Sequence, residues 1–289
     1  MNLFCILFAI SQFVYSVSSY NINEANITLH LSGSAYCGKE NYNTMKLYEP
    51  ANEFQIDTIL HDITTDLQGF VGYIANRKTI YVVFRGSSSP LNWVEDLEIK
   101  KVPYTTFATC NCEIHKGFYN SALAVKDMVV YSVMKLNKML RYDTIIVTGH
   151  SYGAAVSQII GMELINLGIL CQVYNFGQPR IGDDKYAAFV NSKLMNYWRF
   201  THNKDIVPHV PPMTGLSYMH SCGEIFENEY GDLTTCSIKN CEDKMCADQY
   251  SLKETNGDDH KVYLQHSLDC EANAVIYNYN KKHKYYKLL

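Results

Sequence analysis

Short apolar runs alternate with longer stretches of helical periodicity through the middle of this chain. The runs at 71–74 and 80–84 predict two strands, because each is short, apolar and rich in branched or aromatic side chains. A polar turn around residues 76–78 separates them. Apolar residues then recur every three or four positions over roughly 116–140, which predicts a long helix.

The alternation continues beyond that helix. The pattern predicts a strand over 144–148, a helix over 153–167, a strand over 171–177, a helix over roughly 183–194 and a strand over 197–201. Strands that alternate with helices in this way are typical of α/β proteins. We therefore expect a central, mostly parallel sheet with helices on both faces.

The segment 222–258 differs from the rest, because it is rich in cysteine and acidic residues and has little periodicity. We expect it to be a surface excursion braced by disulfide bonds. No repeat or low-complexity linker divides the remaining sequence. With 289 residues and 47% hydrophobic content, residues 20–289 can bury one large core, and we expect them to form a single domain.

The first nineteen residues carry no charged side chain, are mostly apolar, and end in the small residues 16–19. This pattern predicts a signal peptide over 1–19, cleaved near Ser19, and an uncleaved anchor is the alternative. No other segment is apolar enough to cross a bilayer, so we expect no transmembrane segment in the mature chain. We expect a protein that is secreted or resides in the lumen of the secretory pathway.

Cleavage would leave nine cysteines, which in an exported chain predict four disulfide bonds and one free thiol. Cys171 is our candidate for the free thiol, because it opens an apolar strand. The spacing of Cys236, Cys241 and Cys246 also allows a zinc site, but an oxidising compartment favours bridges, and we expect no metal. Asn26 begins the one glycosylation sequon, and we expect it to be glycosylated at an accessible surface. A net charge of −4 gives no general attraction for nucleic acid.

The sequence Gly149-His150-Ser151-Tyr152-Gly153 lies between a predicted strand and a predicted helix. This is the G-x-S-x-G pattern between a strand and a helix. In that context the pattern is typical of a sharp turn that exposes a nucleophilic serine. The turn aims the amide of Tyr152 at a developing oxyanion. We interpret Ser151 as the nucleophile and His150 as a structural neighbour.

A serine nucleophile needs a base, and the base needs an orienting carboxylate. In α/β hydrolases these follow the serine in the order acid, then base. Asp205 lies just after the strand 197–201, in a loop stiffened by Pro208, which suits the orienting carboxylate. Asp183 and Asp184 are the alternative, but they resemble a helix N-cap.

The candidates for the base, all of which follow Asp205, are His209, His220, His260 and His266. We favour His260, at the end of a polar loop that re-enters apolar sequence. His209 is too close to Asp205 to fold back easily onto the same site. His220 and His266 are more typical of packed side chains.

A second oxyanion donor is expected after an earlier strand. Ser87 fits, because the strand 80–84 ends in glycine and serines. Directly after it, a short amphipathic helix is predicted over 90–97, with its apolar side chains at Leu91, Trp93 and Val94. Such a helix beside an oxyanion loop suggests a movable lid over an acyl-binding cleft. Ordinary core packing by Trp93 is the alternative.

Taken together, these segments resemble the fungal-type class 3 lipases, which have an α/β-hydrolase-type fold. The resemblance covers roughly residues 33–270. The stretches that carry it are 83–89, 92–97, 115–118, 147–155, 175–182, 203–208 and Asp259-His260-x2-Tyr263.

The resemblance implies Ser151 as nucleophile, Asp205 as orienter and His260 as base. It also implies an oxyanion hole at Ser87 and Tyr152, and a lid around residues 88–96.

The resemblance also reaches the cysteines and the mature N-terminus. Tyr36 resembles a tyrosine that the family places beside the oxyanion loop, and Cys37 paired with Cys270 would resemble the long-range disulfide of the family. The tight Cys110-Asn111-Cys112 and the long cysteine cluster over 222–246 depart from the family pattern. These two departures leave the pairing of their cysteines open.

The expected function is therefore that of a secreted serine carboxyl-ester hydrolase acting on acylglycerols at a lipid–water interface. No metal or organic cofactor is implied. Two alternatives on the same fold are an esterase for phenolic or short-chain esters and a phospholipase A1. A lipid-binding homologue without catalysis is an alternative of a different class.

Overall fold

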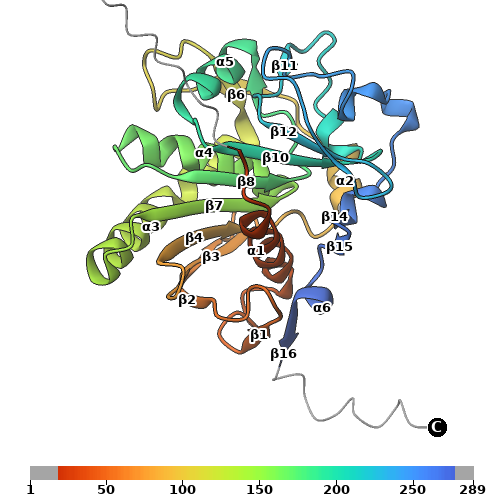
Figure 1. Ribbon diagram of the computed structural model, residues 1–289. Helices are drawn as coiled ribbons and strands as arrows, with labels where there is room; N and C mark the ends of the chain where they lie inside the picture. The colour runs from red at the N-terminus through yellow and green to blue at the C-terminus, as the bar shows by residue number, and fades with distance from the viewer. Residues whose placement is uncertain (1–18, 277–289) are drawn as a thin grey trace, which may run out of the picture.

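The computed structural model describes residues 19–276, and its centre is an eight-stranded twisted sheet (Figure 1). The inner strands are parallel and both ends of the sheet are antiparallel. In spatial order the strands are β13 (Leu233–Thr235), β12 (Glu224–Glu227), β10 (Tyr197–His202), β8 (Gln172–Phe176), β7 (Thr144–His150), β4 (Thr79–Phe84), β3 (Leu67–Ile74) and β2 (Gln55–Asp62).

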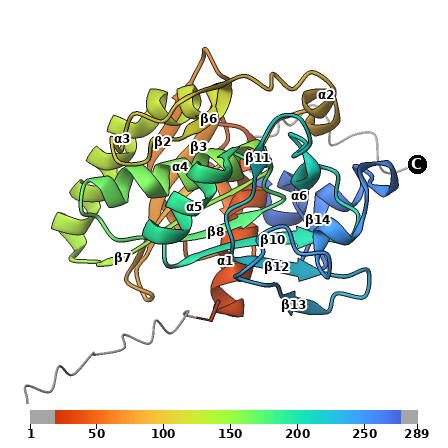
Figure 2. The same cartoon turned by 90° about the horizontal axis from the view of Figure 1, so that it is seen from above.

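Helices cover both faces of this sheet (Figure 2). The α-helices of the described chain are α1 (Ile22–Ser34), α2 (Pro90–Glu95), α3 (Lys116–Leu140), α4 (Tyr152–Asn166), α5 (Asp184–Lys193) and α6 (Cys270–Asn273). Alternate residues of β4 face opposite layers, as the two-residue period of a strand requires. Val82 and Phe84 pack in the core that contains α3 and α4, whereas Tyr81 and Val83 pack in the core that contains α1.

Smaller elements complete the described chain. Two-stranded sheets pair β1 (Met45–Leu47) with β16 (Ala274–Ile276), and β14 (Val262–Tyr263) with β15 (His266–Ser267). A four-stranded sheet contains β5 (Lys101–Pro103), β6 (Glu113–His115), β9 (Gly182–Asp183) and β11 (Tyr218–Met219). Short 3-10 turns are η1 (Ala35–Cys37), η2 (Val207–His209), η3 (Ala247–Gln249), η4 (Leu252–Glu254) and η5 (Asp259–Lys261).

The predicted fold class, an α/β-hydrolase-type sheet with helices on both faces, is confirmed. The long helix α3 has the bounds that the periodicity gave. Its first turn is capped by His115, whose Nδ1 accepts a hydrogen bond from the amide of Phe118 (3.2 Å), and it ends at Arg141 in the left-handed region. Asp183 caps α5 through the amide of Tyr186 (2.8 Å), so it is not free to orient a base.

The hydrophobic pattern does not predict α1. This helix lies between the sheet and the C-terminal strap, by which we mean residues 259–276, and its buried side chains include polar Thr28 and Ser32 as well as apolar residues. Polar and apolar positions are buried alike, so no apolar stripe with a helical period marks it. Instead, α1 begins at Asn21, whose side chain accepts hydrogen bonds from the amides of Asn23 and Glu24.

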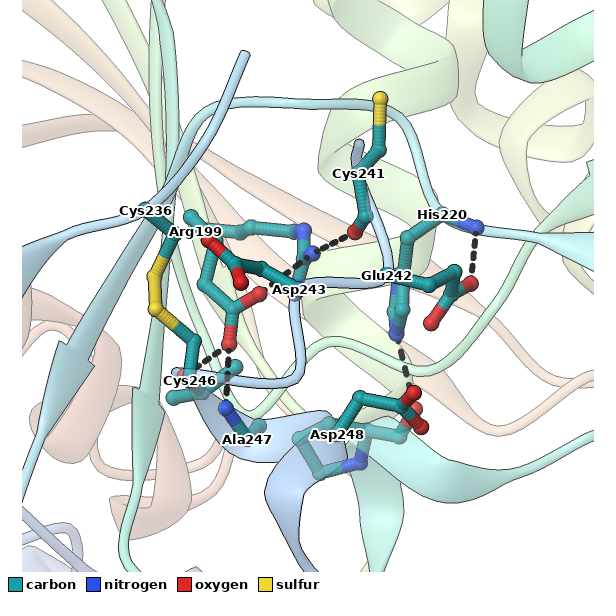
Figure 3. Close-up of polar contacts among 12 residues, drawn as sticks. Arg199, His220, Cys236, Cys241, Glu242, Asp243, Cys246, Ala247 and Asp248 are labelled. Atoms are coloured by element: carbon teal, nitrogen blue, oxygen red, sulfur yellow. Dashed lines mark hydrogen bonds and ion pairs between the residues drawn. A yellow bond between two sulfur atoms is a disulfide. The ribbon is translucent and has the colours of Figure 1, made fainter. Parts of the chain in front are cut away.

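The expectation that 222–258 is only a surface excursion is wrong, because β12 within it is a buried strand parallel to β10. Glutamates at both ends of this strand hid it from the hydrophobic pattern. Buried Arg199 of β10 pairs with Glu224 (2.9 Å) and donates to the carbonyl of Cys241 (2.8 Å; Figure 3). Arg180 forms a bidentate ion pair with Glu242, in which Nε and Nη2 each donate to one carboxylate oxygen (2.8 Å each). Buried charges require such partners, so these pairs fix the segment to the sheet.

Four disulfide bonds brace the described chain. One joins Cys37 to Cys270, 233 residues away, and the other three join near neighbours: Cys110–Cys112, Cys222–Cys241 and Cys236–Cys246. The free cysteine among the described residues is Cys171, which is buried. Cys236, Cys241 and Cys246, whose spacing also allowed a zinc site, all form disulfide bonds. In this state none of the three can bind a metal as a thiolate.

Two further expectations concern the N-terminal part. Residues 1–18, nearly all of the predicted signal peptide, lie outside the described residues. Asn26 lies on α1 and is half-buried, while the hydroxyl of Thr28 is buried and bonded to the carbonyls of Glu24 and Ala25. Over residues 19–276, no helix combines the length and apolarity needed to cross a membrane.

Candidate active site

Ser151 occupies the sharp turn between β7 and α4. Its backbone is in a strained region, with φ 57° and ψ −126°, and its amide donates to the carbonyl of Phe176 (2.9 Å). The flanking glycines are needed on steric grounds. A Cβ on Gly149 would lie 2.4 Å from the carbonyl oxygen of Gly153, and one on Gly153 would lie 2.4 Å from the carbonyl oxygen of Phe84. The geometry is that of a nucleophile elbow.

Asp205 and His260 form a buried pair close to this turn. His260 Nδ1 donates to Asp205 Oδ2 (2.8 Å), and each side chain is 1% exposed. The other carboxylate oxygen, Oδ1, accepts from the amide of Val207 (2.8 Å). The hydroxyl of Tyr263 also donates to Oδ2, and burial together with the Asp205 charge raises the pKa of Tyr263, so that it keeps its proton. The carboxylate is therefore held in one orientation and fixes the histidine tautomer.

The ring of His260 lies next to Gly177, the residue after Phe176, and the carbonyl of Phe176 accepts a hydrogen bond from the amide of Ser151. A Cβ on Gly177 would lie 2.7 Å from His260 Cε1. Ser151 Oγ and His260 Nε2 are both buried, and neither has a hydrogen-bond partner within the described residues. The structure thus brings the predicted serine, aspartate and histidine together but leaves the serine–histidine hydrogen bond unmade. Such bonds often tighten only when substrate binds.

His150 supports this pair from behind, in agreement with its interpretation as a structural neighbour. Its Nδ1 bonds to the hydroxyl of Tyr36 (2.7 Å), its Nε2 donates to the carbonyl of His260 (2.8 Å), and the two imidazole rings lie 4.3 Å apart. Burial is the main cause that lowers the pKa of His150 well below its usual value, and the neighbouring His260 lowers it further. His150 is therefore a neutral support at physiological pH.

Two of the alternative histidines, His220 and His266, form hydrogen bonds elsewhere. His220 Nε2 donates to the carbonyl of Pro208 (2.8 Å), and burial lowers the pKa of His220 well below 6.5. His266 bonds to Asn273 (3.1 Å), seven residues further along the C-terminal strap. His209 is buried in η2, and its pKa is lowered by burial and then by Arg180.

The loop after β4 lies directly against the nucleophile. A Cβ on Gly86 would lie 2.1 Å from the hydroxyl of Tyr36 and 2.9 Å from Ser151 Cβ. Ser87 is the next residue, half-buried, and its Oγ accepts from the amide of Ser89 (3.3 Å). Tyr152 begins α4, where amides of the first turn have no acceptor within the helix. Both predicted oxyanion donors therefore flank the serine.

The predicted lid is α2, which protrudes at the rim of the molecule (Figure 2). It contains Leu91, Trp93 and Val94, and the last two are half-buried. The indole of Trp93 lies 6.1 Å from the ring of Tyr152, edge to face, and 5.9 Å from the ring of Phe118. Ser151 is 0% exposed, and Trp93 packs against the residue that follows it.

Sequence reasoning missed the residue before the base. The carboxylate of Asp259 accepts three hydrogen bonds from the loops that carry Asp205 and His260, from Asn203, Lys204 and Asn256. In the sequence, the signal for this role is the position of Asp259 next to the candidate base His260.

A buried acid–base pair beside an elbow serine, on a mostly parallel sheet, is characteristic of α/β hydrolases. The profile of the family described as Lipase (class 3) matches residues 81–215. The chain belongs to the class 3 lipase family.

Relatives of known sequence agree with this assignment. A lipase of Rhizomucor miehei is 30% identical over 235 residues, which is 78% of this chain and 64% of the relative. The secreted mono- and diacylglycerol lipase A of Penicillium camembertii is 28% identical over 212 residues, 71% of this chain and 65% of the relative. The chain thus spans slightly less than two thirds of the length of these relatives.

Solved structures are also similar. A triacylglycerol lipase whose catalytic centre is described as a serine protease triad superposes with a TM-score of 0.77 at 28% identity. Lipase II of Rhizopus niveus gives a TM-score of 0.77 at 26% identity. Each comparison covers 86% of this chain and 96% of the other.

Proposed function

We propose that this protein is a serine carboxyl-ester hydrolase that acts on acylglycerols. The observation that carries the proposal is the pair of buried, unpartnered atoms, Ser151 Oγ and His260 Nε2, next to the oxyanion loop. A buried polar atom without a partner costs free energy, and these two atoms belong to the serine of the elbow turn and to the histidine that Asp205 orients. The similar proteins described above, a mono- and diacylglycerol lipase and a triacylglycerol lipase, support the substrate class.

In the proposed mechanism His260 Nε2 takes the proton of Ser151 as Oγ attacks the ester carbonyl. Asp205 stabilises the imidazolium that forms through Nδ1. The amides of Ser87 and Tyr152 bind the tetrahedral oxyanion. His260 then gives its proton to the leaving alcohol, and water, activated by the same histidine, releases the fatty acid. Each step uses protein groups and water alone.

An esterase for short-chain or phenolic esters, and a phospholipase A1, remain rival activities of the same site. Hydrolysis of emulsified triolein, phosphatidylcholine vesicles, methyl ferulate and soluble p-nitrophenyl butyrate, with Ser151→Ala as the control, separates them. We expect triolein to be hydrolysed fastest and Ser151→Ala to be inactive on all four. Hydrolysis of phosphatidylcholine or methyl ferulate without triolein would contradict the acylglycerol proposal, and lipid binding without any hydrolysis would indicate the inactive homologue.

We further propose that the protein is exported, with residues 1–19 removed and Asn26 glycosylated. Four disulfide bonds are typical of an oxidising compartment and support export, and one relative is itself a secreted lipase. N-terminal sequencing of protein from the culture medium is expected to begin at or near Tyr20. Detection of residues 1–19 on the mature protein would contradict cleavage.

A further inference from the structure

Two loops carry the proposed acid and base, and they are joined along their backbones. The aspartate loop is residues 203–206, and the histidine loop is residues 256–260. The amide of Asn256 donates to the carbonyl of Lys204 (2.8 Å), and the amide of Ile206 donates to the carbonyl of Asn256 (3.0 Å). These bonds join the start of the histidine loop, at Asn256, four residues before His260, to the aspartate loop. The end of the loop next to His260 needs a separate contact.

Asp259 supplies this contact, because its carboxylate bonds both loops at once. Oδ2 accepts hydrogen bonds from Asn203 Nδ2 (3.1 Å), from the amide of Lys204 (3.1 Å) and from Asn256 Nδ2 (2.8 Å). An ionised carboxylate is a strong acceptor for several donors, and charge-assisted bonds are about twice as strong as neutral ones. One oxygen atom thus gathers donors from both sides of the acid–base pair.

The main chain of Asp259 is held as well. Its carbonyl accepts from His202 Nδ1 (2.9 Å), at the end of strand β10, and its amide donates to Asn256 Oδ1 (2.9 Å). Asn203 adopts a left-handed backbone (φ 38°), a conformation that needs support from its surroundings. The side-chain bond from Asn203 to Asp259 provides part of that support.

We propose that Asp259 is a positioning residue, whose carboxylate sets the placement of His260 relative to Asp205 and Ser151. The proposal rests on the function proposed above. Asp259 does not contact the reacting atoms, and it acts through the backbone of the adjacent His260. The serine–histidine bond must form in the substrate complex, and a base displaced by a fraction of an ångström forms it less often.

The neighbouring residue provides a matched control. Asp258 has the same side chain one position earlier, but it is 91% exposed and pairs only with Lys261 (2.9 Å), as far as the described residues show. The variants are Asp259→Ala, Asp259→Asn and Asp258→Ala in the full-length enzyme. For each one, kcat and KM are measured on soluble p-nitrophenyl butyrate. Labelling of Ser151 by diethyl p-nitrophenyl phosphate and thermal unfolding are measured in parallel.

We expect Asp259→Ala to lower kcat roughly 10- to 100-fold with KM unchanged, because orientation rather than binding is lost. Labelling of Ser151 is expected to slow by the same factor. Asp259→Asn retains an acceptor oxygen and is expected to recover most of the lost rate. Asp258→Ala is expected to match the parent enzyme.

The proposal is overturned if Asp259→Ala keeps the kcat and labelling rate of Asp258→Ala. It is also overturned if Asp259→Ala raises KM while kcat is unchanged. A third contradicting result is an Asp259→Asn variant that is as slow as Asp259→Ala although its unfolding temperature shows that it is folded. If Asp259→Ala fails to fold, Asp259→Asn at the full parent rate supports positioning by the acceptor oxygen. The proposed function fails by a different result, in which Ser151→Ala still hydrolyses ester.

Discussion

At the scale of single residues, the site depends on hydrogen bonds that fix one tautomer and one orientation. His260 receives its orientation from Asp205 on one side, and His150 supports its backbone from the other. Tyr263 adds a hydroxyl to the same carboxylate oxygen. The proposed nucleophile needs no such restraint, because its strained turn already fixes it.

This arrangement predicts how the triad variants compare. Ser151→Ala and His260→Ala are expected to lower kcat by several orders of magnitude and by similar factors, because the two residues act as one unit. Asp205→Asn is expected to cost less than removal of the serine. Single-turnover kinetics on p-nitrophenyl butyrate measure all three. If His220→Ala abolished activity and His260→Ala did not, the assignment of the base would be wrong.

The sequence was sufficient to predict which residues meet here, for reasons that can be named. Strand, turn and helix surround Ser151 in the printed sequence, and the order of acid and base left few candidates. The contacts of Asp259 could not be predicted, because they depend on how two loops 50 residues apart fold against each other. Pattern along the chain carries no information about such loop–loop contacts.

At the scale of elements, helix α3 connects a titratable group to stability. His115 caps this helix and is buried, and burial lowers its pKa to about 4. Between pH 6.5 and pH 4 the unfolded chain binds a proton there that the folded chain excludes. The free energy of unfolding therefore falls with decreasing pH, by up to about 1.4 kcal/mol per pH unit from this group.

The substitution His115→Asn tests this directly. Asparagine is a favoured N-cap and can accept the hydrogen bond from Phe118, but it does not titrate. We expect the variant to match the parent stability near pH 7 and to lose less stability between pH 6.5 and pH 4.5. Urea unfolding at several pH values measures the difference. Parallel losses in both proteins would show that other groups dominate.

The lid helix gives a second prediction at this scale. Burying one large apolar side chain is worth roughly 1.5–3 kcal/mol, so Trp93 can shift a closed–open equilibrium. At an oil surface the indole would face lipid instead of Tyr152. We expect Trp93→Ala to lose far more rate on emulsified triolein than on soluble p-nitrophenyl butyrate. Equal losses would indicate that Trp93 is ordinary core and that α2 is not a working lid.

Elements were predictable from sequence where one face alone is buried or where the strand is wholly apolar. Helix α3 and strand β4 meet these conditions, and their bounds followed from the pattern. Helix α1 and strand β12 do not, because each buries polar or charged side chains that find partners elsewhere in the fold. Those partners come from distant parts of the chain, which no local window contains.

At the scale of the whole molecule, the disulfide from Cys37 to Cys270 ties α1 and η1 to the C-terminal strap that carries His260. We expect non-reducing peptide mapping to find this bridge, the three short ones, and an unreactive Cys171, whose pKa burial raises to about 12. The double variant Cys37→Ala with Cys270→Ala is expected to lose up to about 5 kcal/mol of stability, because the bridge closes a very long loop.

Urea unfolding of this double variant, compared with Cys110→Ala combined with Cys112→Ala, measures that contribution. The bridge of Cys110 to Cys112 closes a loop of very few residues and is expected to contribute far less. A Cys37 peptide linked to any partner other than Cys270, or similar losses in both double variants, would contradict this prediction.

The separation of Cys37 from Cys270 also has a consequence for biosynthesis. A ribosome completes Cys37 long before Cys270, and every other bridged cysteine is made in the interval, each close to its own partner. During that interval the thiol of Cys37 has no native partner. It can form a mixed disulfide, by thiol–disulfide exchange, with each new cysteine that emerges. Correct assembly therefore depends on an environment that reshuffles wrong pairs as well as one that oxidises thiols. Recombinant production in a compartment with a disulfide isomerase is expected to yield far more active protein than production in a reducing cytosol.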